Sequence, residues 1–157
     1  MLLTYVLFNI MLLFKITNFV IIVFQCLVIV CIGLFDDPAV HSNVRIFVTQ
    51  RTIALAYVTF GTFLIHCLVY LITKLFGEYY PWKTSALMSL IAIVLFIACS
   101  ATILQDWSNV KDRSYWPPNM HRLDLMCASG FTSLIVAALF LIDVVITVRY
   151  GIKEQVD

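Results

Sequence analysis

Residues Leu125–Val148 read LMCASGFTSLIVAALFLIDVVITV, an apolar run in which Asp143 is the only charged residue. A helix rises about 1.5 Å per residue, so about 20 apolar residues are enough to cross the hydrocarbon core of a bilayer. Three runs of similar length and composition come before it, at Ile16–Leu34, Thr52–Ile72 and Ala86–Leu104. The sequence therefore predicts an all-α protein, a bundle of four transmembrane helices joined by short loops.

The overall composition agrees with this architecture. Hydrophobic residues make up 62% of the chain and charged residues 12%, and the mean hydropathy is +1.00. Because the four runs use most of the 157 residues, we expect a single membrane domain over 1–157. The stretch Met1–Phe14 is also apolar, but it lacks the basic start and the small-residue cleavage site of a signal peptide. We expect 1–15 to be an interfacial helix or an extension of the first span.

The orientation in the membrane follows only weakly from charge. An even number of spans places both termini on the same side. The loops and tails carry equal numbers of Lys and Arg residues on the two sides, so the positive-inside rule gives a tie. We favour cytoplasmic termini in a multi-pass plasma membrane protein.

All five cysteines fall within apolar runs, and none forms a C-x-x-C pair. Thiols in such positions usually behave as small hydrophobic groups. Their absence from the loops argues against a claudin, with its cysteine pair in the first loop, against a tetraspanin and against a membrane thiol oxidoreductase. The cysteines are Cys26, Cys31, Cys67, Cys99 and Cys127.

A few polar residues lie at membrane depth, where ionisable groups are costly and often functional. Asp143 is in the last third of the fourth span, and the antiparallel order of spans brings Asn18 and His66 to a similar depth on the same side. Lys15 is one turn nearer the surface. These four residues are candidates for one polar layer inside the bundle.

Two interpretations of this layer are open. A carboxylate and an imidazole together are suited to a proton or cation site. A conducting path needs further polar residues through the other leaflet, and the middle of the first two spans offers only Gln25 and Thr59. We therefore favour an interhelical hydrogen-bond network that fixes packing. Small residues at four-residue spacing, Ser129, Ser133 and Ala137, also predict close helix packing.

The predicted loops supply the candidates for contacts outside the bilayer. Most loop aromatics are expected to anchor the spans at the headgroup region. The third loop combines charges and aromatics with the stiffening pair Pro117 and Pro118, and the first loop contains an acidic turn ending at Pro38. The loop contact candidates are Asp36, Asp37, Trp107, Asp112, Arg113, Tyr115 and Trp116.

Motifs of catalysis and cofactor binding are missing from the sequence. It contains no G-x-S-x-G, H-E-x-x-H, Walker loop or dinucleotide fingerprint, and its three histidines are spread over two loops and one span. The net charge of +1 gives no reason to expect nucleic acid. We predict no enzyme, no catalytic or metal-binding residues, no cofactor and no small-molecule substrate.

The second half of the chain resembles snakeskin, the four-span protein of insect smooth septate junctions. The third span ends Ala101–Trp107 as ATILQDW, Arg122 opens the fourth span, and Leu141, Ile142 and Asp143 come near its end. These landmarks match in order and spacing, and span number and loop length agree along most of the chain. The first loop departs from the family, because snakeskin is rich in glycine there and this chain has none in 35–51.

The resemblance implies a structural, non-enzymatic component of an occluding epithelial junction in the lateral plasma membrane. Such a protein assembles in the bilayer with other junction membrane proteins, and with copies of itself, to form a paracellular barrier. It also implies cytoplasmic termini, as does the broader MARVEL-type group. The alternatives are a MARVEL-like membrane-organising or vesicle-trafficking protein and, third, a small proton-linked transporter using His66 and Asp143.

Overall fold

The computed structural model describes residues 22–40, 48–76, 82–111 and 120–156, without the side chains of 74, 75 and 150 onward. These residues form four helices and, within the described ranges, no strand. All four are long and apolar enough to cross a membrane, which confirms the predicted all-α bundle. The helices are Ile22–Val40, which we call the first helix, α2 (Gln50–Leu75), α3 (Trp82–Lys111) and α4 (Met120–Val156).

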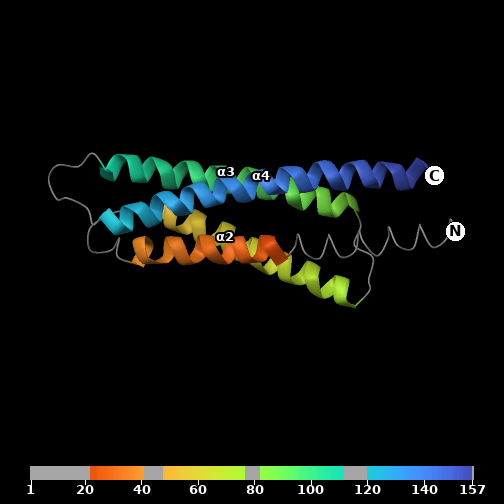
Figure 1. The fold of residues 1–157 in the computed structure, drawn as a ribbon, viewed down its shortest axis with the longest axis horizontal. Coiled ribbons are helices and arrows are strands. Elements are labelled where there is room, and N and C mark those ends of the chain that lie inside the picture. Colours follow the sequence, from red (N-terminus) through yellow and green to blue (C-terminus); the bar gives the residue numbers. More distant parts are fainter. Residues whose placement is uncertain (1–21, 41–47, 77–81, 112–119, 157) are drawn as a thin grey trace.

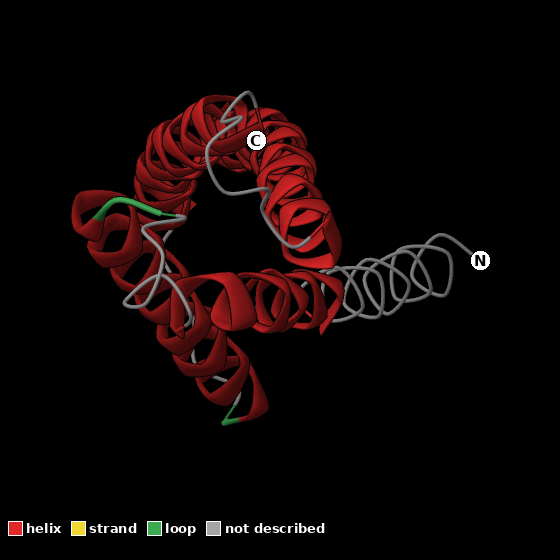
Figure 2. Cartoon of the chain, turned by 90° about the vertical axis from the view of Figure 1, so that its left-hand side faces the viewer, coloured by secondary structure: helices red, strands yellow, loops and turns green. Residues whose placement is uncertain are grey.

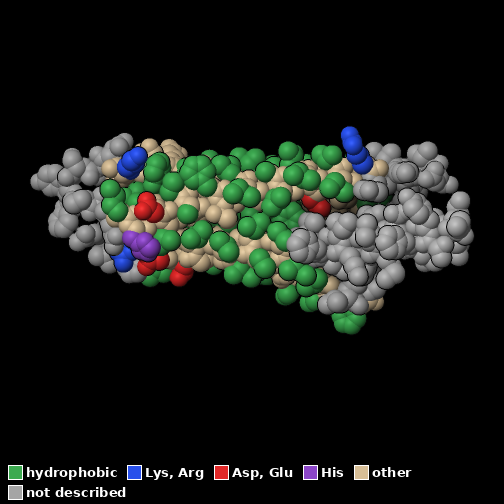
Figure 3. All heavy atoms as spheres, viewed as in Figure 1, with side chains coloured by type: hydrophobic (Ala, Val, Ile, Leu, Met, Phe, Trp, Pro, Cys, Tyr) green, Lys and Arg blue, Asp and Glu red, His purple; other side chains and the backbone are tan. Residues whose placement is uncertain are grey.

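Successive helices run in opposite directions along one elongated bundle (Figure 1). The α3 and α4 helices lie side by side over much of their length, whereas α2 is inclined and its C-terminal end separates from the others (Figures 1 and 2). The chain thus forms an antiparallel bundle with one splayed helix. Hydrophobic side chains cover the middle of the visible face, and most of the charged ones lie toward the ends (Figure 3). This distribution is that of a membrane-spanning bundle.

The observed helices extend beyond the predicted spans. The first helix continues past Leu34 to Val40, and α3 continues past Leu104 to Lys111. The predicted acidic turn at Asp36 is therefore helical, as is Trp107. The α4 helix likewise begins before Leu125 and continues past Val148. The predicted start of the first span and the segment 1–15 lie outside the described residues.

Aromatic rings from all four helices fill the centre of the bundle. Phe96 of α3 is fully buried, and its ring centroid lies 5.9 Å from Phe60, 5.5 Å from Phe63 and 5.9 Å from Phe140. Phe24 of the first helix stacks on Phe140 at 4.4 Å. Ring pairs at such separations attract one another beyond their burial. In a membrane, where lipid is as apolar as the core, this packing holds the helices together.

Small residues of α4 allow close approach of its neighbours. Ser129, Ser133 and Ala137 are buried, as their spacing predicts. At Gly130 an added Cβ atom would lie 2.8 Å from Leu104 Cδ2, so α3 and α4 are close there. The Ser100 hydroxyl donates a hydrogen bond of 2.7 Å to the carbonyl of Gly130 and ties the same two helices together.

Candidate functional site: polar contacts of the bundle

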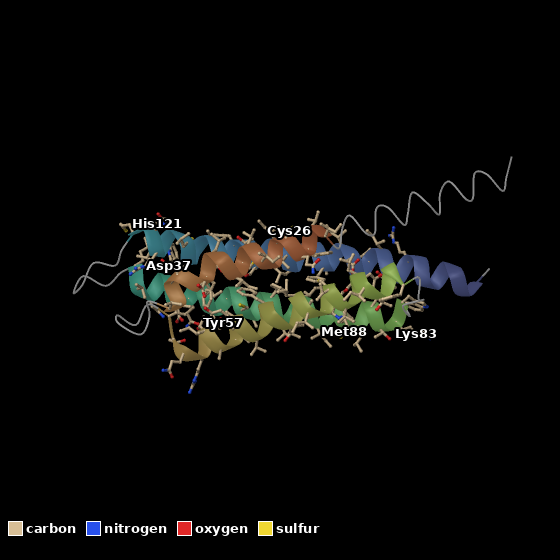
Figure 4. All side chains as sticks on the ribbon, turned by 90° about the horizontal axis from the view of Figure 1, so that it is seen from below. Cys26, Asp37, Tyr57, Lys83, Met88 and His121 are labelled. Carbon is tan, nitrogen blue, oxygen red and sulfur yellow. The ribbon has the colours of Figure 1, made fainter. Side chains whose placement is uncertain are left out.

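Polar side chains join the helices at one end of the bundle. We call this set the end layer: Asp36, Asp37, Thr49, Tyr57, Asp106 and Arg122. The Tyr57 hydroxyl of α2 donates a hydrogen bond of 2.8 Å to Asp36 of the first helix. Arg122 Nε of α4 lies 3.2 Å from Asp37 Oδ2, also on the first helix. The first helix is therefore fixed to both α2 and α4, and Asp37, Tyr57 and His121 gather at this end (Figure 4).

Asp106 connects α3 to the start of α2. Its Oδ2 accepts a hydrogen bond of 2.9 Å from the backbone N–H of Thr49 and one of 3.2 Å from the Thr49 hydroxyl. Thr49 precedes the first residue of α2, and its Oγ1 in turn accepts from the N–H of Thr52 at 3.4 Å. This is the position and the bonding of an N-cap residue. A carboxylate that is only 9% exposed is thus satisfied by the donors at a helix start.

The end layer changes the interpretation of the predicted loop contacts. Asp36 and Asp37 lie on a helix and bind other helices of the same chain, although Asp36 remains exposed. Trp107 is half-buried on α3, packs against the core, and has the Lys111 ammonium 5.0 Å from its ring centroid. Asp112, Arg113, Tyr115 and Trp116 lie outside the described residues. The carboxylates of the first helix and of Asp106 thus find partners elsewhere in the bundle, which compensates for the helices extending beyond the predicted spans.

Asp143 is the only charged residue in the apolar run 125–148 of α4, and its partner is Ser89 of α3. Ser89 Oγ donates a hydrogen bond of 2.8 Å to Asp143 Oδ2. Ser89 is 6% exposed, and Asp143 is half-buried. We call Ser89 and Asp143 the inner pair.

The predicted polar layer is only partly described. His66 is half-buried on α2, and its ring centroid lies 6.3 Å from that of Phe63 with the two rings nearly perpendicular, so it lies against the aromatic core. Lys15 and Asn18 lie outside the described residues. The predicted polar layer grouped Asp143 with Lys15, Asn18 and His66 and did not include Ser89. No local signal identifies this pair, because its members are 54 residues apart in the chain.

Aromatic and aliphatic packing separates the inner pair from the end layer. On α4, Phe140 and Val136 follow Asp143 toward the end layer, and on α3, Phe96 and Ile103 follow Ser89 in the same direction. The hydroxyls in this region bond within the bundle: Ser129 Oγ donates to the carbonyl of Cys31 at 3.4 Å, and Ser133 Oγ to that of Ser129 at 2.9 Å. The buried Thr59 hydroxyl makes no hydrogen bond with the described residues.

The arrangement offers packing interactions and no group of metal ligands among the residues described. No set of three or more His, Cys, Asp or Glu side chains there is placed to hold a metal ion. The inner pair and the end layer are each built from hydrogen bonds between helices. Both sets can fix helix positions, the inner pair within the apolar part of the bundle and the end layer at its more exposed end.

Comparison of the chain with protein-family models, with curated proteins and with solved structures gives no match.

Proposed function

We propose that this chain is a structural component of an occluding epithelial junction of the smooth septate type. It lies in the lateral plasma membrane with both termini cytoplasmic. There it assembles sideways with other junction membrane proteins and with its own copies to restrict paracellular passage. Two observations support the proposal: the resemblance of the sequence to snakeskin and the packed geometry of the helix bundle.

The observation that carries the structural role is the internal bonding of the inner pair. A transporter needs a connected series of polar groups through the membrane. Here Asp143 bonds to Ser89, and buried rings such as Phe96 and Phe140 lie between this pair and the end layer. The described interior is thus packed, and its hydroxyls serve to hold helices at fixed distances.

The outer surface supports lateral assembly. Large apolar side chains project from every helix, including Ile29 of the first helix, Val58 of α2, Val94 of α3 and Ile135 of α4. Val58 and Val94 are 65% and 66% exposed. Such a surface is stable only against lipid tails or other membrane helices. The exposed apolar faces of all four helices can therefore contact other membrane proteins in the plane of the bilayer.

The experiment that tests the proposal is to image a C-terminally tagged copy in a polarised epithelium beside a junction marker. The proposal expects a continuous line along lateral contacts, lost when known junction proteins are removed. Puncta inside the cell without junctional signal would contradict it and would favour a trafficking role.

A second experiment separates packing from transport. Asp143→Asn keeps an acceptor for Ser89 and removes the charge. A packing role expects normal surface expression, mild loss of stability or assembly, and no pH-dependent ion flux in either the wild type or the variant. Flux that is present in the wild type and abolished in the variant would overturn the structural role.

A further inference from the structure

Gln25 is a polar residue in the apolar part of the first helix. It lies three turns before the exposed Asp36 of the end layer, or about 16 Å at about 1.5 Å per residue. Because the hydrocarbon core of a bilayer is about 30 Å thick, this distance places Gln25 near its middle. The neighbouring Phe24 stacks on Phe140 in the aromatic core, which agrees with this depth. The Gln25 amide is therefore surrounded by protein and lipid and not by water.

The Gln25 side chain is half-buried, and no hydrogen bond joins it to the described residues. An amide carries two N–H donors and an acceptor oxygen, and leaving them without partners is costly in hydrocarbon. Other polar side chains of the interior, such as Ser100 and Ser133, bond within the bundle. The Thr59 hydroxyl has no partner in the described chain, but it is fully buried, so a second molecule does not reach it. Gln25 is thus a polar group that the described chain leaves for a partner outside it.

Gln25 lies beside an exposed face of the first helix. Ile22 and Ile29, three residues before it and four after it, are 48% and 54% exposed. This is the spacing of residues that meet a parallel helix in a coiled coil. Cys26 and Gly33 border the same face, and both are exposed. A Cβ atom added at Gly33 would meet no atom within 4 Å, so no other described helix covers the face there. Small residues at such positions let a second helix approach closely.

The chemistry of Gln25 favours a second copy of this chain as its partner. Two copies inserted with the same orientation carry Gln25 at the same depth. A two-fold axis along the membrane normal brings the same residues of the two first helices together. Because an amide both donates and accepts hydrogen bonds, Gln25 of one copy satisfies Gln25 of the other. A carboxylate or an ammonium at this position would instead repel its own copy.

We propose that two copies of this chain pair through their first helices, with the Gln25 amides hydrogen-bonded to each other across the interface. Ile22 and Ile29 pack against their counterparts on either side of this bond. The two-fold axis closes the pair, so this contact forms a dimer and not a chain of copies. The inference names the face used in the lateral self-assembly proposed above and rests on that part of the proposed function.

The test is the association of the full chain, purified and reconstituted alone in phosphatidylcholine vesicles at a series of protein-to-lipid ratios. Copies are counted by photobleaching of one fluorophore per chain. We expect dimers that dissociate on dilution in lipid. Gln25→Leu has a similar size but no amide, and it should lower the dimerisation constant several-fold. Wild-type monomers at every ratio, the result expected if the partner of Gln25 is a different protein, would overturn the proposal.

Two further variants locate the interface. Thr62→Val is the matched control, because it removes an exposed hydroxyl from α2, and such a hydroxyl can bond to its own helix backbone. It should leave the dimerisation constant unchanged. Gly33→Ile fills open space with a residue of higher helix propensity, so it should lower dimerisation without weakening the fold. If Gln25→Leu or Gly33→Ile dimerises as well as Thr62→Val, the face beside Gln25 is not the interface and the proposal fails.

Cys26 supplies a reporter next to Gln25. It is exposed on the first helix, well away from the end layer (Figure 4). The other cysteines are buried or half-buried: Cys31, Cys67, Cys99 and Cys127. Oxidation in the vesicles by copper phenanthroline should link two copies through Cys26, and Cys26→Ala should abolish the linked dimer. A linked dimer that persists in Cys26→Ala would place the interface on another face. These measurements use the pure protein, so their failure is distinct from a failure of the junctional location, which is imaged in cells.

Discussion

Removing the hydrogen bond between Ser89 and Asp143 should weaken the bundle by an amount that a double-mutant cycle can isolate. The bond is 2.8 Å long, and both partners are at least half-buried in the apolar part of the bundle. Interhelical hydrogen bonds in membrane proteins average about 0.6 kcal/mol and reach about 1.7 kcal/mol. A short bond to a carboxyl group belongs in the upper part of this range. We expect a coupling of about 1–1.7 kcal/mol, or roughly a tenfold change in the unfolding equilibrium.

The assay is reversible unfolding in mixed micelles of the wild type, Ser89→Ala, Asp143→Ala and the double variant. The coupling is the difference between the effect of the double variant and the sum of the single effects. Ser85→Ala is the control, because Ser85 is half-buried one turn earlier on α3 and no hydrogen bond joins it to Asp143. A coupling below about 0.3 kcal/mol, which is the usual error of additivity, would refute the assignment of the inner pair to packing.

Three further changes test the packing of the bundle by the same unfolding assay. Gly130→Ala places a Cβ atom 2.8 Å from Leu104 Cδ2, at the far end of a flexible side chain, and should lower the free energy of unfolding by at most about 1–3 kcal/mol. Adding Leu104→Ala should remove most of that loss; a loss from Gly130→Ala that is equally large in the Leu104→Ala background would show that Leu104 is not its cause. Phe96→Ala removes a fully buried ring and should cost at most about 3–5 kcal/mol, and a cost below about 1 kcal/mol would mean that the aromatic core is loosely packed. Asp37→Asn should lower the free energy of unfolding by less than about 1 kcal/mol, because the Asp37 and Arg122 side chains are 41% and 26% exposed. This loss should become smaller in high salt, and a loss that does not depend on salt would contradict a solvent-screened ion pair.

The four helices follow from the sequence because each apolar run reaches the length that a bilayer requires. Runs such as Ala86–Leu104 contain no charged residue. Apolar side chains are suited both to the lipid-facing surface of a helix and to the interior of the bundle. The small residues Ser129 and Ser133 also indicate their buried face, because only small side chains permit close approach. The length of an apolar run and the size of its side chains can be obtained from one segment of sequence, so the helices and the close-packed face of α4 are predictable.

The helix ends and the polar partners depend on contacts between distant segments. Asp36, Asp37 and Pro38 look like a turn, but Tyr57 and Arg122 satisfy the two carboxylates, so the helix continues to Val40. Pro38 lacks a backbone N–H, so it removes a single hydrogen bond from the helix. Sequence spacing within one helix carries no information about a partner on another.

The aromatic core was also missed, for a different physical reason. On a soluble helix, the buried face is distinguished by its apolar residues. On α3 both the buried Phe96 and the exposed Val94 are apolar, because one faces the bundle and the other faces lipid. Hydrophobic periodicity therefore does not identify the inward face of a membrane helix.

The most direct test of the structural role is the passage of an uncharged tracer between the cells of a polarised epithelium that expresses this chain. Depletion of the chain should raise paracellular passage several-fold, with no change in transcellular ion flux. Re-expression of the wild type or of Asp143→Asn, which keeps the acceptor for Ser89, should restore the barrier at least in part. Tracer passage that is unchanged on depletion would contradict a role in the occluding barrier.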